Sequence, residues 1–331
     1  MAAPMRYPPA PWIRPVGEEA LLSDQNCPGM NERIGFVGVG AMGEPMAANL
    51  VKKGFPLTTV IHRRPDPARA LEAKGARIAP SLSALIEECP VVIACLPTST
   101  EVEAVVLGPG GILEKAARGG IFVDMGTSRP SSTRMLAKQL EARGIAMLDA
   151  PITGGIRGAR EGTLTIYVGG APEVFARVRP ALEAMGRTVL HMGTTAAGHV
   201  TKLMNNILSL ASMAVLAEVL PLGVRAGLDP AKLIEALAAG SGASAQIPGR
   251  GDRILRRHFT PSFRVDLAHK DLRLAQELAQ EVNLALPMTS AALITFTMAR
   301  ALGCDGEDTT AVVKVWEQVA GVEVRGTAKR P

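Results

Sequence analysis

The sequence is poor in aromatic residues and in cysteine, and each shortage argues against a class of protein. Aromatic side chains make up only 3% of the 331 residues, so the stacking platforms that bind single-stranded nucleic acid are scarce. The four cysteines lie far apart with no Cys-x-x-Cys pair, which argues against a zinc site or a disulfide scaffold and fits a reducing compartment. We therefore expect a cytoplasmic protein with no metal site and no nucleic-acid partner.

Apolar runs long enough to enter a membrane are also nearly missing. Residues 1–30 contain no continuous apolar stretch typical of a signal peptide. Residues 207–224 are apolar enough to be considered as a span, but they contain Glu218 and Pro221. A buried helix or a subunit contact is the better interpretation, and we expect no membrane association.

What the chain does contain is typical of a globular protein of two domains. Hydrophobic residues make up 47% and charged residues 20%, with a net charge of +5. Lysine and arginine are scattered, so this mild excess suits a phosphorylated cofactor and an acidic small molecule. Residues 1–31 are predicted to be a disordered extension. Because Met30 directly precedes the stretch "NERIGFVG", where a compact domain would begin, the native start is left open.

Apolar runs and helical patterns alternate through the first half of the chain. This alternation predicts a parallel sheet with crossover helices, and after residue 198 only helical patterns remain. The prediction is an α/β Rossmann-type domain over 32–193, an all-α domain over 194–320 and a frayed tail over 321–331. The strand candidates are 34–39, 57–61, 91–96, 120–125, 145–148 and 164–168, and the helix candidates include 68–74, 83–88, 131–143, 200–225, 230–239, 267–282 and 287–302.

A glycine-rich segment follows the first strand candidate and opens a helix. Its Gly-x-Gly-x-x-Gly spacing permits a tight turn, a close approach of the backbone to a pyrophosphate, and close helix packing. The alternatives are an ordinary tight turn or the nucleoside site of a methyltransferase. We predict a dinucleotide site whose residues are Gly38, Val39, Gly40, Ala41, Met42 and Gly43.

The end of the second strand candidate distinguishes the two dinucleotides. An acidic residue there would bind the ribose of NAD, whereas an arginine would bind the 2′-phosphate of NADP. The sequence has His62, Arg63 and Arg64, and no acid before Asp66. The arginines are also compatible with solvated surface charges. We predict NADP as the preferred cofactor, with NAD as the alternative.

Two further segments are candidates for substrate binding. Thr153, Gly154 and Gly155 can present successive N–H groups to a carboxylate, although a plain glycine-rich connection is the alternative. Lys202 and Asn206 share one helix face with Asn205, among apolar neighbours. Such polar groups must find partners or open onto a cavity; the alternative is a lysine at an exposed helix start with two amides that cap loops.

Five stretches together resemble the β-hydroxyacid dehydrogenase family, which includes 3-hydroxyisobutyrate dehydrogenase and tartronate semialdehyde reductase. The resemblance runs in unbroken order over about residues 32–320. The stretches are "CLPTSTEV" (95–102), "DMGTS" (124–128), "DAPITGGIRGAREGTL" (149–164), "GHVTKLMNNIL" (198–208) and "HKDLRLA" (269–275).

The resemblance implies a role for several single residues. Lys202 matches the catalytic lysine and Asn206 the amide that orients the substrate, while the loop at Thr153, Gly154 and Gly155 holds the acid group of the substrate. The family usually has serine where this chain has Thr153. Leu96, Pro97 and Thr127 match positions that line the cofactor, and Lys270 reaches across the cleft to the cofactor side. Glu101 departs from relatives that carry asparagine and is left out of the site.

The function implied is hydride transfer between NADP(H) or NAD(H) and a short β-hydroxy acid or its semialdehyde. The leading substrate candidates are 3-hydroxyisobutyrate and tartronate semialdehyde (2-hydroxy-3-oxopropionate); a glyoxylate or succinic semialdehyde reductase is the alternative. A non-catalytic NADP-binding module or an imine reductase would lack Lys202. The apolar residues from Leu203 to Val224 surround their helix on all sides, which predicts a homo-oligomer, a dimer or a tetramer.

Overall fold

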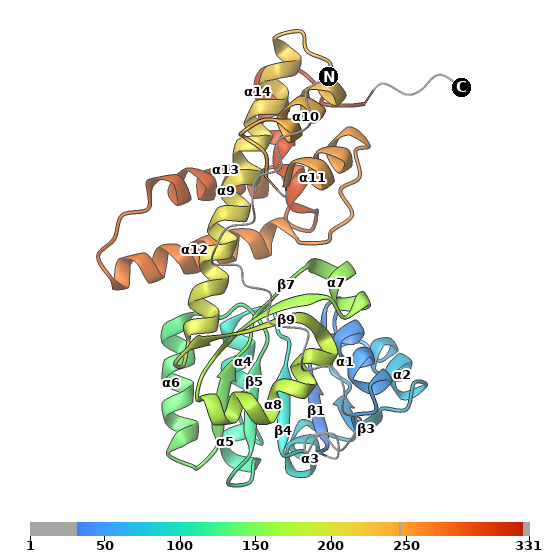
Figure 1. Cartoon of the computed structure of the whole chain (residues 1–331), viewed down its shortest axis with the longest axis vertical. Helices are drawn as coiled ribbons and strands as arrows, with labels where there is room; N and C mark the ends of the chain where they lie inside the picture. Colours follow the sequence, from blue (N-terminus) through green and yellow to red (C-terminus); the bar gives the residue numbers. More distant parts are fainter. Residues whose placement is uncertain (1–31, 245, 327–331) are drawn as a thin grey trace, which may run out of the picture.

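The computed structural model describes residues 32–244 and 246–326. Figure 1 shows a layered α/β part in blue and green, from which the long yellow helix α9 runs up into a helical part in orange and red. The predicted Rossmann-type fold followed by helices is confirmed. The expected disorder of residues 1–31 lies outside the described residues.

A single mixed sheet forms the centre of the first part. Its strand order is β3-β2-β1-β4-β5-β6-β8-β7, and β9 pairs with β8. The first six strands are parallel, whereas β8 runs antiparallel to both β6 and β7. The strands are β1 (Ile34–Val37), β2 (Leu57–Val60), β3 (Arg77–Ala79), β4 (Val91–Ala94), β5 (Ile121–Asp124), β6 (Ala146–Asp149), β7 (Ile152–Thr153), β8 (Leu164–Gly169) and β9 (Gly186–Gly193).

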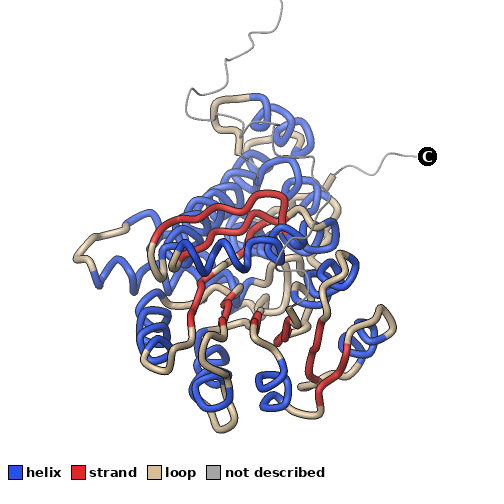
Figure 2. Tube along the Cα trace, turned by 60° about the horizontal axis from the view of Figure 1, so that its bottom comes forward, coloured by secondary structure: helices blue, strands red, loops and turns tan. Residues whose placement is uncertain are grey.

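Helices cover both faces of this sheet, as the blue coils around the red strands in Figure 2 show. Strands β1, β4 and β5 are buried along their whole length, which explains why they read as continuous apolar runs. The helices of this part are α1 (Gly43–Lys52), α2 (Asp66–Glu72), α3 (Leu82–Glu88), α4 (Ser99–Leu107), α5 (Ile112–Lys115), α6 (Pro130–Glu141), α7 (Gly155–Glu161) and α8 (Pro172–Met185).

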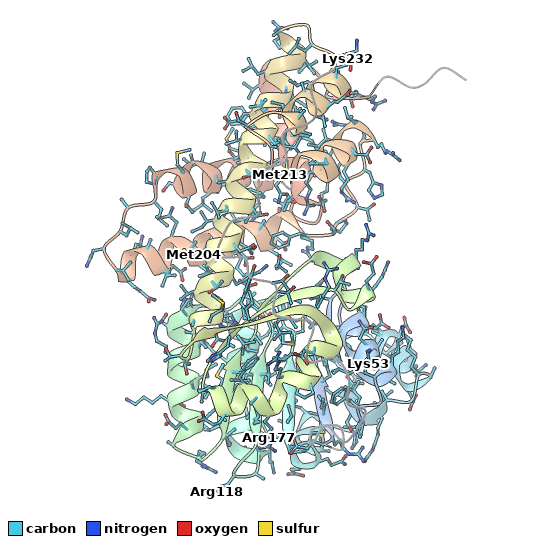
Figure 3. The ribbon with its side chains drawn as sticks, in the orientation of Figure 1. Lys53, Arg118, Arg177, Met204, Met213 and Lys232 are labelled. Atoms are coloured by element: carbon cyan, nitrogen blue, oxygen red, sulfur yellow. The ribbon has the colours of Figure 1, made fainter. Side chains whose placement is uncertain are left out.

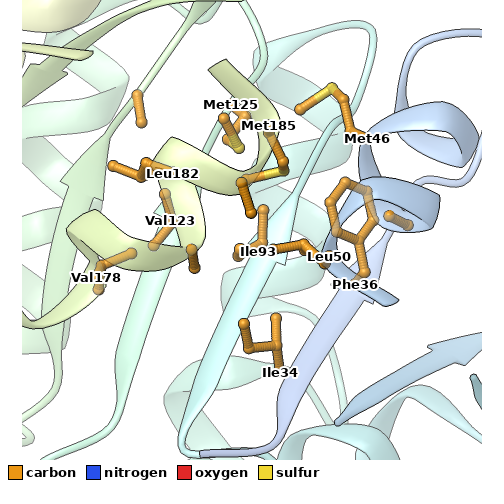
Figure 4. Packing of buried hydrophobic residues seen from close by; sticks show 14 of the residues in the cluster. Ile34, Phe36, Met46, Leu50, Ile93, Val123, Met125, Val178, Leu182 and Met185 are labelled. Atoms are coloured by element: carbon orange, nitrogen blue, oxygen red, sulfur yellow. The ribbon is translucent and has the colours of Figure 1, made fainter. Parts of the chain in front are cut away.

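Alternate residues of each strand build two hydrophobic cores, one on each face. On one face Phe36 packs with Leu50 of α1 and Leu182 of α8, part of the cluster drawn in Figure 4. On the other face the core contains Leu85 of α3 and Leu136 of α6. These helices therefore hold the strands in place, and with them the loops at the strand ends.

The second part is organised around α9, which is 29 residues long. It packs against α12, α13 and α14 and also contacts β8, and its residues Met213 and Leu216 belong to the helical core. The helices of this part are α9 (Ala197–Arg225), α10 (Pro230–Ala239), α11 (Gln246–Leu255), α12 (Val265–Glu281), α13 (Pro287–Ala301), the 3-10 turn η2 (Thr309–Val312) and α14 (Val313–Ala320).

The length and composition of α9 would allow it to cross a membrane, but 44% of its most apolar window is buried inside the protein. That burial, together with its packing partners, identifies a core helix. The helix is apolar on all sides, as predicted, but the described residues bury it only on the side that faces the other helices. Leu208 is 73% and Leu222 68% exposed.

The structure shows three strands that the prediction missed, and order in part of the tail that was predicted to be frayed. Strands β3 and β7 were missed because they have only three and two residues, and β9 because most of its residues are exposed and break the apolar pattern. The predicted frayed tail is wrong over 321–326. There Val324 is fully buried, its N–H donates to Glu317, and the N–H of Gly326 donates to Leu255.

Candidate functional site

The candidate site lies at the carboxyl ends of the parallel strands. The strand order reverses between β1 and β4, and in open α/β sheets ligands bind in the crevice at such a switch point. The loops after β1, β4 and β5 carry the residues predicted to bind the cofactor. Helix α9 begins four residues after β9 and brings Lys202 to the same end of the fold.

The glycine turn after β1 has the geometry that a pyrophosphate requires. Gly38 has a φ of +92°, a conformation that suits glycine. A Cβ on Gly43 would lie 2.0 Å from the carbonyl oxygen of Gly38, whereas a Cβ on Gly40 would meet nothing within 4 Å. The turn therefore packs tightly at Gly43, whereas the space beside Gly40 is open. In that space the N–H groups at the start of α1 can face an anion. The residues of this turn fit a dinucleotide.

Two arginines project from the loop between β2 and α2. His62, Arg63 and Arg64 are all exposed. Among residues 32–244 and 246–326, neither arginine forms an ion pair, and Asp66 begins α2 beyond them. Both guanidinium groups are therefore available to a phosphate bound at the end of β2.

The loops after β4 and β5 carry three of the residues predicted to line the cofactor. Leu96 and Thr127 are half-buried and Pro97 is exposed. Glu101 accepts a hydrogen bond from the hydroxyl of Thr98 at the start of α4. That contact gives Glu101 a local partner, which agrees with its omission from the predicted site.

Lys202 is the buried cation of the site. It is only 9% exposed, and in the part of the chain that the structure describes its ammonium has no hydrogen bond or ion pair. Burial lowers its pKa to about 8, an effect that Asp271 opposes and Lys270 reinforces. A lysine with a pKa lowered in this way can both accept and donate a proton near neutral pH.

A chain of polar contacts links α9 to α12 and to the loop after β5. The Asn206 amide donates to Asp271 over 2.6 Å, and the Lys270 ammonium lies 3.1 Å from the same carboxylate. Lys270 also donates to the carbonyl oxygen of Thr127 over 2.6 Å. The predicted residues Asn206, Lys270 and Thr127 are therefore brought together, with Lys270 bridging the two parts of the fold.

The predicted substrate loop lies between β7 and α7. Gly154 and Gly155 have φ values of +126° and +64°, so their N–H groups belong to a tight turn at the start of α7. Thr153 pairs with Thr165 of β8. The amide of Asn49 on α1 donates to the carbonyl oxygen of Ala159 over 2.7 Å, which joins α7, directly after this turn, to the helix that follows the glycine turn.

Two family models match consecutive parts of the chain. The NAD binding domain of 6-phosphogluconate dehydrogenase matches residues 33–193, and the NAD-binding domain of NADP-dependent 3-hydroxyisobutyrate dehydrogenase matches residues 196–316. The chain is 41% identical over 295 residues to the 2-(hydroxymethyl)glutarate dehydrogenase of Eubacterium barkeri, covering 89% of this chain and 98% of that protein. The chain belongs to the β-hydroxyacid dehydrogenase family.

Other members of the family extend the same likeness. The 2-hydroxy-3-oxopropionate reductase of Escherichia coli is 34% identical, covering 87% of this chain and 98% of that protein. The solved structure of Psf3 with NADP⁺ and 2-OPP superposes with a TM-score of 0.78 at 26% identity, covering 85% of this chain and 99% of that one. This β-hydroxyacid dehydrogenase is accordingly an NAD(P)-dependent oxidoreductase that acts on a small molecule.

Two residues of this β-hydroxyacid dehydrogenase site escaped the sequence analysis. Asp271 is not among the predicted residues, since a Lys-Asp pair on an amphipathic helix is usually solvated, yet it is only 3% exposed. Tyr167 on β8 donates to the Asn205 side chain over 3.5 Å, and Asn205 donates to Asn206 over 3.0 Å. The signal for Asp271 was its position directly after Lys270; no sequence pattern pointed to Tyr167.

A cavity of about 240 Å³ opens at the opposite end of the sheet of this β-hydroxyacid dehydrogenase. It lies at the amino ends of β4 and β5, between Pro90, Gly120 and Arg118. In a parallel sheet the chemistry is expected at the carboxyl ends, and the glycine turn and Lys202 do not line this cavity. We therefore place the candidate site in the crevice and not in this cavity.

Proposed function

We propose that this enzyme transfers a hydride between NADP(H) and a short β-hydroxy acid or the matching semialdehyde, with Lys202 as the general acid and base. The observation that carries the proposal is the buried Lys202 ammonium. It is only 9% exposed and has no ion pair of its own in the described residues. A lysine in such a position is costly to keep unless a ligand uses it.

The chain's own residues handle the proton. During oxidation the neutral Lys202 amine accepts the proton of the substrate hydroxyl, and during reduction the ammonium donates a proton to the carbonyl oxygen. A bound nicotinamide dinucleotide supplies or accepts the hydride. Asn206, held by Asp271 over 2.6 Å, orients the substrate, and the N–H groups of Gly154 and Gly155 bind its carboxylate.

The substrate candidates are 3-hydroxyisobutyrate and 2-hydroxy-3-oxopropionate, with glyoxylate or succinic semialdehyde as the alternative. The named relatives that act on a 2-(hydroxymethyl)glutarate and on 2-hydroxy-3-oxopropionate support a short carboxylic acid. The methyl group of Thr153, next to the carboxylate turn, favours a small substituent. We propose a cytoplasmic location, because the described cysteines Cys89, Cys95 and Cys304 are all free thiols.

The proposal is tested by following the oxidation of NADPH and of NADH in the presence of four carbonyl compounds. These are 2-hydroxy-3-oxopropionate, methylmalonate semialdehyde (the oxidised partner of 3-hydroxyisobutyrate), glyoxylate and succinic semialdehyde. Turnover of at least one with NADPH is expected. If NADPH binds, as judged by its fluorescence, while no compound is turned over, the protein is instead a cofactor-binding module. Faster turnover with NADH than with NADPH would contradict the preference for NADP.

The pH dependence follows from the lowered pKa of Lys202. Oxidation needs the neutral amine, so kcat/KM should rise with pH and level off above about 8; reduction needs the ammonium, so its rate should fall above about 8. Since the Asp271 charge raises the pKa of Lys202, Asp271→Asn should move both inflections to lower pH. Profiles that do not move in the variant would contradict this electrostatic link.

We also propose that the enzyme is a homo-oligomer built on the exposed side of α9. Leu208, Val215 and Leu222 recur every seven residues and are 73%, 49% and 68% exposed, so they lie along one stripe of the helix. Met204, one turn before Leu208, continues the stripe toward the α/β part (Figure 3). An exposed apolar stripe of this length is typical of a protein–protein contact.

The double variant Leu208→Glu and Leu222→Glu should dissociate this oligomer, because it places carboxylates in an apolar contact. Light scattering coupled to gel filtration measures the mass of the wild type and of the variant. Leu107→Glu, on the 40% exposed Leu107 of α4, is the matched control and should leave the mass unchanged. A monomeric wild type would overturn the proposal.

A further inference from the structure

A buried polar cluster lies just below the site and takes no part in the proposed function. It consists of Asp124 at the end of β5, Asp149 at the end of β6, Thr133 on α6, Ser128 and His199. All five side chains are at most 2% exposed. His199 lies in the first turn of α9, three residues before Lys202, so the cluster adjoins the turn that carries the catalytic lysine.

Asp149 fixes the start of α9. Its two carboxylate oxygens accept hydrogen bonds from the backbone N–H of Ala196 over 2.7 Å and of His199 over 2.8 Å. The backbone packs closely around this carboxylate. A Cβ on Gly169 would lie 2.5 Å from the Asp149 side chain, and a Cβ on Gly198 would lie 2.4 Å from the carbonyl oxygen of Tyr167. The carboxylate therefore caps a helix whose N-terminus attracts negative charge.

Asp124 fixes the loop that lines the cofactor. One of its oxygens accepts the N–H of Gly126 over 2.8 Å, and the other accepts the hydroxyl of Ser128 over 2.6 Å. Thr127 lies between these two anchors, and its carbonyl oxygen receives the Lys270 ammonium. A displacement of Asp124 would therefore also displace Thr127.

The ring of His199 stands between these two anchored segments. Its Nδ1 lies 2.8 Å from the Thr133 hydroxyl, and its Nε2 lies 3.7 Å from an Asp124 oxygen. Nε2 is buried and has no hydrogen-bond partner among residues 32–244 and 246–326. Buried ring nitrogens normally find a partner. The Thr133 hydroxyl has two acceptors within reach, the carbonyl oxygen of Arg129 at 3.2 Å and Nδ1 at 2.8 Å. The shorter contact favours donation to Nδ1, which places the ring proton on Nε2, where it faces the Asp124 carboxylate.

We propose that His199 is a positioning residue for the reaction: its Nε2–H, directed at Asp124, couples the loop around Thr127 to the helical turn that carries Lys202. The proposal rests on the assignment of Lys202 as acid and base. It adds an explanation of how Lys202 on α9 is held in position relative to the loop that follows β5. Misplacement of a catalytic group by about 1 Å can cost about 10²-fold in rate, so the attraction between Nε2–H and the Asp124 carboxylate, acting over 3.7 Å, affects kcat through the position of Lys202.

Two replacements of His199 distinguish the roles of the two ring nitrogen atoms. Glutamine carries its amide near the position of Nε2 and can still donate to Asp124, whereas asparagine places its amide near Nδ1 and retains only the contact with Thr133. We expect His199→Asn to lower kcat by about 10-fold to 10²-fold and His199→Gln to stay within about 3-fold of the wild type. The KM values should change less than kcat in both variants.

A second measurement does not depend on turnover. In the cofactor-free protein, hydrogen exchange followed by mass spectrometry should become faster in both segments 125–129 and 196–204 in His199→Asn, and in neither in His199→Gln. His258→Asn is the matched control, since His258 is exposed and lies beyond α11. It should change neither exchange nor kcat.

Equal losses of kcat in the asparagine and glutamine variants would overturn the coupling through Nε2, and so would faster exchange confined to segment 196–204. Full activity of His199→Asn would overturn it as well. If the wild type turns over no substrate, the assignment of Lys202 fails, but the exchange experiment still decides whether His199 links the two segments.

Discussion

Replacement of Lys202 by methionine is expected to lower kcat by about 10²-fold to 10⁴-fold, the usual contribution of a general acid or base. This corresponds to about 3–5 kcal/mol of transition-state stabilisation. Methionine keeps most of the volume of the side chain and removes a buried charge, so the free energy of unfolding should not fall. Steady-state rates in both directions and the thermal midpoint measure the two effects separately.

Lys232→Met is the matched control for this variant. Lys232 is exposed on α10, at the far end of the helical part (Figure 3), and its replacement should leave kcat unchanged. The Lys202→Met variant should still bind NADPH, because the glycine turn and the arginines after β2 remain. A variant that keeps more than about a tenth of the wild-type kcat would exclude Lys202 as the proton carrier.

The fold of the first part could be predicted because its strands are buried on both faces. Strands such as β4, with the sequence Val-Val-Ile-Ala, need apolar residues at every position, and this continuous pattern is easily recognised. The predicted strands 34–39 and 91–96 extend two residues beyond the observed ones. These extra residues, including Val39 and Leu96, form the loops of the site, where the chain leaves the sheet.

The part of the site that lies on one element could also be predicted, whereas the contacts between distant elements could not. Lys202 and Asn206 share a helix face whatever the fold around them. The burial of Asp271 depends on the packing of α12 against α9, which no local pattern encodes. The same holds for His199, whose partners Asp124 and Thr133 lie on β5 and α6 and are more than sixty residues away in sequence.

The cofactor preference is the second large effect, and it is expected from Arg63 and Arg64. Each guanidinium that binds a phosphate contributes about 1.5–3 kcal/mol through charge-assisted hydrogen bonds. Arg63→Ala combined with Arg64→Ala should therefore raise the Kd for NADPH by about 10²-fold to 10⁴-fold. The Kd for NADH should stay nearly unchanged, because that cofactor lacks the 2′-phosphate.

Salt and a matched arginine distinguish this contact from a general effect of charge. Arg118 is exposed at the opposite end of the sheet (Figure 3), so Arg118→Ala should leave both Kd values unchanged. The affinity of the wild type for NADPH should fall with ionic strength more steeply than its affinity for NADH, and this difference should disappear in the double variant. Equal losses of affinity for NADPH and for NADH would mean that the arginines stabilise the loop between β2 and α2 and do not bind the 2′-phosphate.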